Sequence, residues 1–340
     1  MSPPPNSVKP LRLTVIMPVF EDFAAASLVC QAIDGELARV ENVEARVLML
    51  DDGSPSGLRA WSPFTPARLA SVEVLRLRRN LGHQRAIAVG LCHLADQSAC
   101  DAVLVMDADG EDRPVDIPAL IAELRRTPEA MIFAERRKRM EGATFQLGYL
   151  AYRTLHRVLT GIPVRVGNFS LLPASALPRL VCMSELWNHY AGAALRSRFP
   201  QRRLPLDRGS RVLGRSQMGG IIPLVMHGIA GIATYHDLVA TRILVASIGL
   251  VTLLAAALVS VIGIRVGTSL AIPGWATYAA GTLLVLAIQV LTIAFSLVLS
   301  LISGRTGASF VPCNEYRVFV DRVEALGSRD ALRAASSQVC

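Results

Sequence analysis

The sequence predicts an α/β domain with a mostly parallel sheet, followed by a hairpin of two transmembrane helices. In the first part of the chain, short apolar segments that end in acidic residues alternate with stretches of helical spacing, which is typical of a doubly wound sheet. Further along, residues 243–264 and 266–304 carry no charge. Each run is long enough to cross a bilayer as a helix, and a helix in a soluble core rarely stays uncharged for so long.

The composition agrees with a soluble domain joined to a membrane part. The chain has 340 residues, of which 52% are hydrophobic, and its formal net charge is +8. This length accommodates a catalytic domain and additional segments. Prolines near the start stand where a secretion signal needs an apolar helix, so no signal is expected there. The cysteines show no CxxC spacing, which favours reduced thiols in a cytosolic domain.

The expected elements follow one another from the first strand onward. Strands are expected over Leu11–Met17, Ala45–Leu50, Val72–Leu77, Val103–Met106 and Met131–Ala134, and helices over Ala24–Val40 and Ala86–Leu94. Strands that alternate with helices in this way run parallel, because each helix returns the chain to the same edge of the sheet. The carboxyl ends of the strands then share one edge, where open α/β sheets bind their ligands.

An acidic cluster follows the strand expected at Val103–Met106. Asp107 and Asp109 stand two apart directly after it, with Glu111 and Asp112 close behind. Four acids within six residues repel one another unless a cation offsets their charge, and carboxylate oxygens are ligands that suit Mg²⁺ or Mn²⁺. We therefore expect Asp107, Asp109 and Glu111 to bind a metal ion. The alternative is an acidic surface turn that caps the next helix.

Four motifs in register resemble the family 2 glycosyltransferases of the GT-A fold: VIMPVFED, LDDGS, RRNLGHQRAIAVGL and DADGEDRP. With the two apolar runs, the layout is similar to polyprenyl-phosphate glycosyltransferases of the dolichol-phosphate mannose synthase and bactoprenol glucosyltransferase type. The resemblance implies a UDP- or GDP-linked sugar donor, a polyprenyl phosphate acceptor, Mg²⁺ or Mn²⁺ as cofactor, and inverting transfer at the cytoplasmic leaflet. A nucleic-acid partner is not expected, and assembly with further copies of the chain is compatible with the pattern.

The resemblance also implies roles for individual residues. The donor is expected to bind Pro18, Phe20, Glu21, Asp51, Asp107 and Arg211. Asp109 would ligate the metal that bridges the diphosphate, and Asp107 would reach the ribose or the surroundings of the metal. For residues 51–54 the alternative is an N-cap and turn, because Asp, Gly and Ser are common there.

Two arginine-rich stretches are expected to bind phosphate. Arg137 and Arg139 follow the strand after the acidic cluster, and either could hold the acceptor phosphate, with Arg137 as the third catalytic residue beside the two aspartates. Arg211 lies in RLPLDRGSRVLGRSQMGG, which resembles the segment that closes over the donor, and guanidinium groups match phosphate oxygens bidentately. For both stretches the alternative is a solvated surface.

Three positions depart from the family pattern. Glu111 stands where lipid-phosphate enzymes commonly have glutamine, and Asn168 and Ser170 replace the usual Asp and Arg in GNFSLLPASAL. Glu185 and His189 lie where many family members place a general base, but a phosphate acceptor is already ionised and needs none. For His189 a packed structural role is the alternative.

The same patterns divide the chain into four parts. We expect a catalytic domain over residues 1–218, an interfacial amphipathic helix over 219–241, two spans near 243–264 and 278–302 within 242–304, and a helical cytoplasmic tail over 305–340. Arginines gather before the first span and after the second, and only Arg265 lies between the spans. The positive-inside rule then places the catalytic domain and both termini in the cytoplasm, with the spans in a bacterial inner membrane.

Two other functions fit parts of the pattern. One is a family 2 enzyme that acts on another lipid or on a glycan, and the other is a non-catalytic membrane scaffold that binds a nucleotide sugar. The intact Asp107 and Asp109 argue against the scaffold. A processive polysaccharide synthase would be expected to carry more spans and a QxxRW-like motif, which this sequence does not show.

Overall fold

The computed structural model describes residues 9–98, 100–136, 154–161, 166–213, 231–268, 272, 274–306 and 310–329. The chain divides into two compact units. The first comprises Met1–Ala143, Arg165–Thr234 and Phe310–Cys340, and the second comprises Thr144–Val164 and Tyr235–Ser309. The residues that follow the two long apolar helices therefore return to the first unit.

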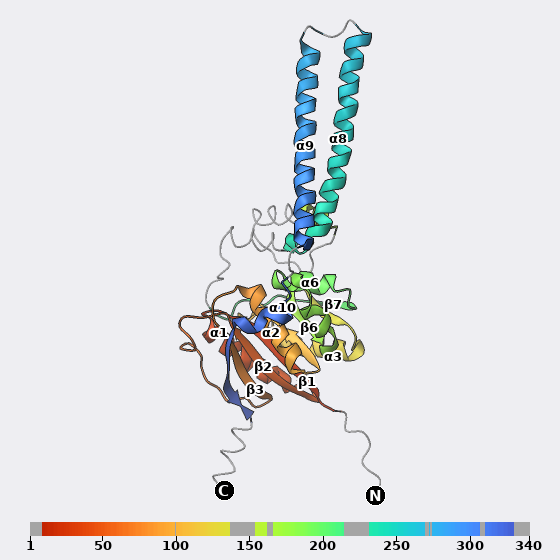
Figure 1. The fold of residues 1–340 in the computed structure, drawn as a ribbon. Coiled ribbons are helices and arrows are strands. Elements are labelled where there is room, and N and C mark those ends of the chain that lie inside the picture. The colour runs from red at the N-terminus through yellow and green to blue at the C-terminus, as the bar shows by residue number, and fades with distance from the viewer. Residues whose placement is uncertain are drawn as a thin grey trace, which may run out of the picture. The chain divides into compact units, whose positions relative to one another are not determined.

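In the described part of the first unit, one sheet has the strand order β7-β5-β6-β4-β1-β2-β3-β8 (Figure 1). The strands are β1 (Leu11–Val19), β2 (Val43–Asp51), β3 (Leu69–Leu77), β4 (Ala102–Val105), β5 (Met131–Arg136), β6 (Val166–Pro173), β7 (Gln201–Leu206) and β8 (Val320–Ser328). The central strands β4, β1, β2 and β3 are parallel, whereas β6 and β8 pair antiparallel with their neighbours. This mixed, mostly parallel sheet confirms the predicted α/β fold class.

Helices cover both faces of the sheet. They are α1 (Phe23–Leu37), α2 (His83–Gln97), α3 (Ile117–Arg126), α5 (Leu177–Val181) and α6 (Tyr190–Arg196). In β1, Val15 and Met17 pack into the core with α1 and α3, whereas Ile16 faces the core with α2, α5 and α6. Because both faces are buried, β4 and the segment Val15–Val19 of β1 are apolar without interruption, which is why the sequence showed them so clearly.

The helix predicted at Ala86–Leu94 begins earlier, at His83. Gly82 precedes it with a φ of 92°, in the left-handed region that favours glycine. This early start brings His83 to the first turn of α2, at the carboxyl edge of the sheet. The side chain of His83 thereby reaches the acidic cluster.

The prediction of a helical tail is wrong for the residues that the structure describes after α9. The short helix α10 (Pro312–Glu315) and the 3₁₀ helix η4 (Tyr316–Phe319) lead into strand β8. An open sheet edge offers unpaired N–H and C=O groups, and β8 satisfies those of β3. Asp96 of α2 holds the segment by accepting hydrogen bonds from the Tyr316 hydroxyl at 2.5 Å and from Arg317 at 2.7 Å.

Two cysteines provide a test of this docked segment. The Sγ atoms of Cys182, which follows α5, and Cys313, in α10, lie 3.7 Å apart. We expect oxidised glutathione to join them through thiol–disulfide exchange, in which each disulfide formed releases two molecules of reduced glutathione. Peptide mapping by mass spectrometry should find the Cys182–Cys313 cross-link in the folded protein and not after denaturation. Glutathione adducts on both cysteines without a cross-link would contradict the docking.

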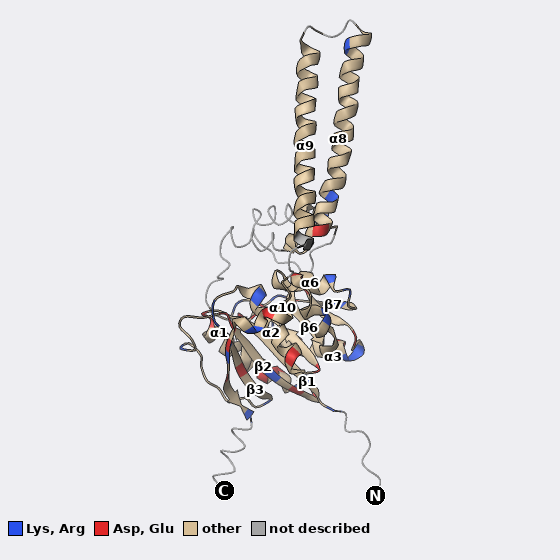
Figure 2. Cartoon of the chain, viewed as in Figure 1, with Lys and Arg blue, Asp and Glu red and all other residues tan. Residues whose placement is uncertain are grey.

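The second unit contains two long apolar helices, α8 (His236–Gly267) and α9 (Trp275–Thr306), which run side by side (Figure 1). Both are long and apolar enough to cross a membrane. Their most apolar windows are 0% and 6% buried in the structure, unlike a helix in a soluble core. Figure 2 shows that charged residues of α8 lie near its ends. The predicted spans fall inside these helices, while residues 219–230 of the expected interfacial helix lie outside the described residues.

Candidate active site

The candidate residues gather at the carboxyl edge of the parallel strands. The strand order places the end of β4, with its acidic cluster, next to the end of β1, and β2 and β3 follow. Neighbouring strands are about 4.8 Å apart. Residues that are almost 90 positions apart in the sequence therefore face one continuous edge, as expected for an open α/β sheet.

The acidic cluster forms a tight loop after β4. The backbone N–H of Asp107 donates to the Asp112 carboxylate at 2.9 Å, and the N–H of Glu111 donates to Asp109 Oδ1 at 2.9 Å. His83 Nε2 lies 3.3 Å from Asp107 Oδ1. Gly110 has a φ of 86°, a conformation that glycine adopts without strain. The loop thus presents Asp107 and Asp109 next to one imidazole.

A basic segment, which we call the strap (Asp207–Val212), lies directly on this loop. Backbone N–H groups of Gly209 and Val212 donate to the carbonyls of Glu111 and Asp109, each at 2.9 Å. The approach is close, since a Cβ on Gly209 would lie 2.6 Å from the carbonyl oxygen of Gly110. The strap is therefore held by backbone contacts, which leave its side chains available for charged partners.

Two arginines of the strap pair with acids of the edge. Arg208 forms an ion pair with Glu111. Arg211 contacts Asp22 at 2.5 Å and lies 3.5 Å from Asp109. Glu111, which stands where the family commonly has glutamine, thus pairs with Arg208. A glutamine at this position would lack the negative charge of the ion pair. In this arrangement the guanidinium groups offset the negative charge of the acidic loop.

Burial and like charges shape the electrostatics of the loop. Burial raises the pKa of Asp109, the Asp107 carboxylate raises it further, and Arg211 and Arg208 offset only part of this. For His83, burial acts to lower the pKa, but Asp107, Asp112 and Asp52 outweigh burial and raise the pKa overall. The site therefore disfavours a bare negative charge at Asp109 and favours a positive one beside Asp107.

Asp51 lies in the interior of the edge, with 0% of its surface exposed. Its Oδ1 accepts the N–H of Ser54 at 2.9 Å, and its Oδ2 accepts Arg76 Nε at 2.9 Å. The turn that was the alternative for residues 51–54 is therefore present. In this structure the carboxylate fixes that turn and the Arg76 guanidinium.

Glu21 ties the end of β1 to the same turn. Its backbone N–H donates to Ser54 Oγ at 2.9 Å, and its carboxylate accepts the N–H of Ser56 at 2.9 Å. The bond from Ser56 lowers the pKa of Glu21. Glu21 has a φ of 56°, a conformation that is uncommon outside glycine. Pro18 lies near the end of β1, opposite Leu50 of β2, and Phe20 follows the strand directly.

Sequence reasoning missed the role of Asp52. This residue is 3% exposed, and its two carboxylate oxygens accept the N–H groups of Leu81 and Gly82 at 2.6 and 2.8 Å. It thereby fixes the turn that leads into α2 and aims His83 at the acidic loop. The two adjacent aspartates of LDDGS were the only indication in the sequence that Asp52 has a role. Which aspartate has which role depends on contacts with β3 and with the turn before α2, which the sequence does not show.

Removal of the Asp52 carboxylate should destabilise the protein. Asp52→Ala leaves the buried N–H of Leu81 and the partly buried N–H of Gly82 without their acceptor, so we expect a loss of about 2 kcal/mol of unfolding free energy. Asp52→Asn keeps one acceptor oxygen and should lose less. The measurement is the denaturation midpoint of the purified full chain in detergent. Equal midpoints for Asp52→Ala and the unmutated protein would rule out this role.

Polar side chains connect His83 to the α6 region. Asn168 contacts His83 Nε2 at 2.8 Å and accepts from Gln84 at 3.2 Å. Gln84 accepts the N–H of Tyr190 at 2.7 Å, and the Tyr190 hydroxyl lies 2.6 Å from Ser170 Oγ. The two residues that depart from the family pattern in GNFSLLPASAL thus belong to one hydrogen-bonded network, which positions His83.

The remaining candidates have structural contacts or lie outside the described residues. His189 Nδ1 accepts the N–H of Gly192 at 3.0 Å and caps α6. Glu185 lies 3.1 Å from Arg196. Arg137 and Arg139, expected at the acceptor phosphate, lie outside the described residues.

The acidic loop fits a divalent cation only in part. In the described ranges no group of three His, Cys, Asp or Glu side chains is arranged to hold a metal. Asp107 and Asp109 are hard oxygen donors in one loop, and Mg²⁺ is commonly held by one or two carboxylates together with substrate phosphates. The third predicted ligand, Glu111, is paired with Arg208. The residues present therefore fit a cation that a bound diphosphate helps to coordinate.

Comparison with known proteins finds a family model and several relatives that this chain resembles. A family model described as glycosyl transferase family 2 matches residues 14–180. The chain is 26% identical over 230 residues to the uncharacterized glycosyltransferase YkcC of Bacillus subtilis, covering 64% of this chain and 68% of that protein.

Two further relatives carry a polyprenyl phosphate in their names. The chain is 22% identical over 138 residues to the dodecaprenyl-phosphate galacturonate synthase of Rhizobium johnstonii, covering 40% of this chain and 39% of the relative. It is 29% identical over 128 residues to the undecaprenyl-phosphate mannosyltransferase of Micrococcus luteus, covering 37% and 49%. The matched region spans less than half of either relative.

Proposed function

We propose that this chain is a family 2 glycosyltransferase that moves a sugar from a nucleotide donor to a polyprenyl phosphate, and the family model that matches residues 14–180 supports this. The observation that carries the proposal is the acidic loop at the end of β4, over which the strap places Arg208 and Arg211. The relatives from Rhizobium and Micrococcus, which are named for polyprenyl phosphates, support this acceptor class.

The donor's diphosphate is proposed to bind between the acidic loop and the strap. Asp107 and Asp109 would hold a divalent cation, and that cation would supply positive charge to the leaving nucleoside diphosphate. Arg211 now pairs with acids, and its guanidinium fork equally suits phosphate oxygens. When the diphosphate binds, Arg211 can exchange Asp109 for phosphate and leave that carboxylate to the cation.

The transfer itself is proposed to invert the anomeric carbon. An acceptor phosphate oxygen forms a bond to this carbon from the side opposite the donor, and the bond from the carbon to the diphosphate breaks. The electron pair leaves with the nucleoside diphosphate. No proton has to be removed, because a phosphate monoester is already ionised near neutral pH. Arg137 and Arg139 are the proposed cations for the acceptor phosphate.

The helices α8 and α9 are proposed to cross the membrane as a hairpin. Arginines gather before α8 and after α9, so the positive-inside rule places both termini and the catalytic unit in the cytoplasm. Reporter fusions at residues 1 and 340 in a bacterial host should both report a cytoplasmic location. A periplasmic signal from the C-terminal fusion alone would mean that the chain crosses the membrane an odd number of times.

One experiment tests the function directly. The purified full chain is incubated with Mn²⁺, undecaprenyl phosphate and a panel of labelled UDP- and GDP-sugars, and labelled lipid is extracted and measured. We expect one or a few donors to label the lipid. Transfer to an added glycan or another lipid, with none to undecaprenyl phosphate, would contradict the proposed acceptor and support the second enzymatic function. Donor binding without turnover on any acceptor would support a scaffold.

A further inference from the structure

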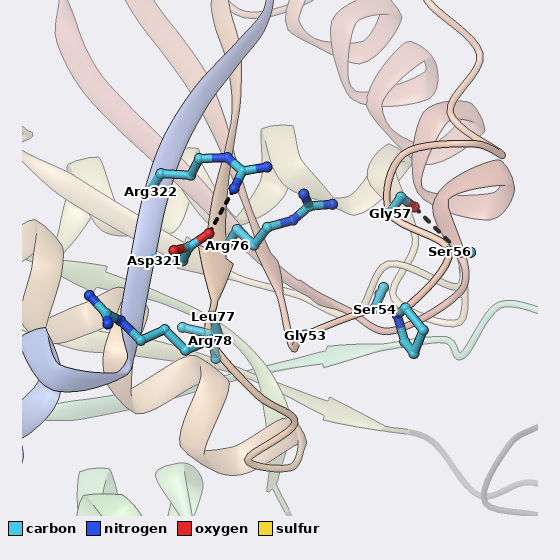
Figure 3. A pocket seen from close by; sticks show the side chains of 10 residues that line it. Gly53, Ser54, Ser56, Gly57, Arg76, Leu77, Arg78, Asp321 and Arg322 are labelled. Carbon is cyan, nitrogen blue, oxygen red and sulfur yellow. Dashed lines mark hydrogen bonds and ion pairs between the residues drawn. The ribbon is translucent and has the colours of Figure 1, made fainter.

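A polar pocket of about 400 Å³ lies between the loop after β2 and the C-terminal strand β8 (Figure 3). Its lining comes from the loop at residues 53–57, from the end of β3 at residues 76–78, and from Asp321 and Arg322 of β8. Two walls belong to the segment that matches the family, and the third follows the apolar helices. The matched segment, residues 14–180, therefore does not contain the whole pocket.

Strand β8 is fixed in this position by the fold. Its register places Arg322 opposite Arg76 and Val320 opposite Leu77. At the entry to β8, the backbone N–H and Nε of Arg78 donate to the carbonyls of Phe319 and Val320 at 2.9 and 3.0 Å. Because β8 runs antiparallel to β3, its first residues lie at the carboxyl end of β3, on the same edge as the acidic loop.

The pocket brings like charges together and balances them. Arg76 and Arg322 are opposite one another on adjacent strands, an arrangement that is unfavourable by itself. Asp51 accepts from Arg76 at 2.9 Å, and Asp321 lies 2.8 Å from Arg322. Glu324 pairs with Arg322 and lies 4.0 Å from Arg76. Guanidinium and carboxylate groups thus stand in near balance, which suits a neutral polar ligand better than a bare polyanion.

The chemistry of this lining suits a nucleobase. Arginine guanidinium planes stack on aromatic rings and donate hydrogen bonds, and carboxylates accept the N–H groups of a base edge. Figure 3 shows the side chains of Arg322 and Arg76 extending toward the loop that carries Ser56 and Gly57. Gly57 leaves the necessary room, because a Cβ there would lie 2.9 Å from an Arg76 guanidinium nitrogen.

The position along the sheet edge suits the nucleoside end of a donor. From β4 to β3 there are three strand spacings in the order β4-β1-β2-β3, or about 14 Å. Between them, Glu21 joins the end of β1 to Ser54 and Ser56 of the pocket loop. A nucleoside diphosphate with its diphosphate at the acidic loop can therefore extend its base along the edge to the pocket.

We infer that β8 completes the donor site, with Arg322 and Asp321 contacting the base and helping to select it. This inference rests on the proposed function, because it takes the nucleotide of the donor as the ligand. It assigns a specificity role to the segment that follows the apolar helices. The same geometry makes the donor site depend on how that segment docks on the catalytic unit.

Binding of nucleoside diphosphates to the full chain tests the inference. UDP, GDP, ADP and TDP are titrated with Mn²⁺ into the detergent-purified protein by calorimetry. For the diphosphate that binds best, Arg322→Ala should weaken binding about tenfold or more, as expected for loss of a charge-assisted contact. Arg126→Ala is the matched control, because it removes an exposed arginine of α3 that pairs with Glu123 of the same helix at 3.7 Å.

Further variants separate recognition from folding. Arg322→Lys keeps the charge and the strand but loses the planar fork, so its affinity should also fall while its melting temperature stays unchanged. Asp321→Asn exchanges an acceptor for an amide that also donates, and it should change the ratio of affinities among the four diphosphates. A merely structural role of β8 would leave that ratio unchanged.

The outcomes also separate this inference from the proposed function. If the unmutated protein binds a nucleoside diphosphate and all β8 variants keep its affinity and base preference, the role of β8 is wrong and the proposed function stands. If the unmutated protein binds none of the four diphosphates, the proposed function and this inference both fail.

Discussion

Asp109→Ala is expected to abolish glycosyl transfer. Asp109 lies in the loop after β4, where it and Asp107 are the carboxylates that fit a divalent cation held together with the donor's diphosphate. Removing one of two protein ligands should remove the cation and the charge that it supplies to the leaving group. We expect a loss of at least about a thousandfold in kcat, measured as labelled lipid formed per enzyme.

The same position should not be needed for folding. Burial and Asp107 raise the pKa of Asp109, so the charged carboxylate is disfavoured in the folded protein without its ligand. For such a group the destabilisation is present above the raised pKa and is relieved as the pH falls through it toward the unfolded value. Asp109→Asn keeps the acceptor for the Glu111 N–H and removes the charge. Its melting temperature near neutral pH should therefore equal or exceed that of the unmutated protein.

The combination of lost turnover and retained stability is the diagnostic result. A matched measurement follows transfer in excess EDTA and then restores Mg²⁺ or Mn²⁺. Activity that persists in EDTA would show that the acidic loop works without a metal. A large fall in melting temperature for Asp109→Asn would show that the loop is a structural turn, which was the alternative for this acidic cluster.

The central strands could be predicted from the sequence because they are buried on both faces. Val15, Ile16 and Met17 show this, since alternate residues belong to different cores and an uninterrupted apolar run results. The position of Asp107 at a strand end followed from the same pattern. The local sequence was therefore sufficient to predict the parallel strands of the sheet and the position of the acidic loop.

Contacts between distant segments could not be predicted in this way. Strand β8 contains exposed charged residues, and only the open edge of β3 makes it a strand. The pairing of Arg208 with Glu111 joins residues separated by 97 positions. The burial of Asp51 and the bonds of Asp52 likewise depend on Arg76 and on the turn before α2. None of these partners is marked by spacing in the sequence.

The arginines of the chain are expected to divide between the two substrates. Arg211 lies in the strap, beside Asp109 and Asp22, where the donor's diphosphate is proposed to bind. Arg137 and Arg139 follow β5 in the sequence and are proposed to hold the acceptor phosphate. Because the two phosphate groups approach the sugar from opposite sides during inversion, each needs its own cations.

Single substitutions should therefore affect one substrate more than the other. Loss of a charge-assisted phosphate contact costs about 1.5 to 3 kcal/mol, which is roughly a tenfold to hundredfold change in apparent affinity. Arg211→Ala should raise the KM for the nucleotide sugar by this factor and change the KM for the lipid phosphate little. Arg137→Ala or Arg139→Ala should do the reverse.

Arg39→Ala, which removes an exposed arginine paired with Glu36 of α1, is the control and should change neither KM. If Arg211→Ala, Arg137→Ala and Arg139→Ala all weaken both substrates equally, or none changes either KM, the division is wrong and these arginines serve only a solvated or lipid-facing surface.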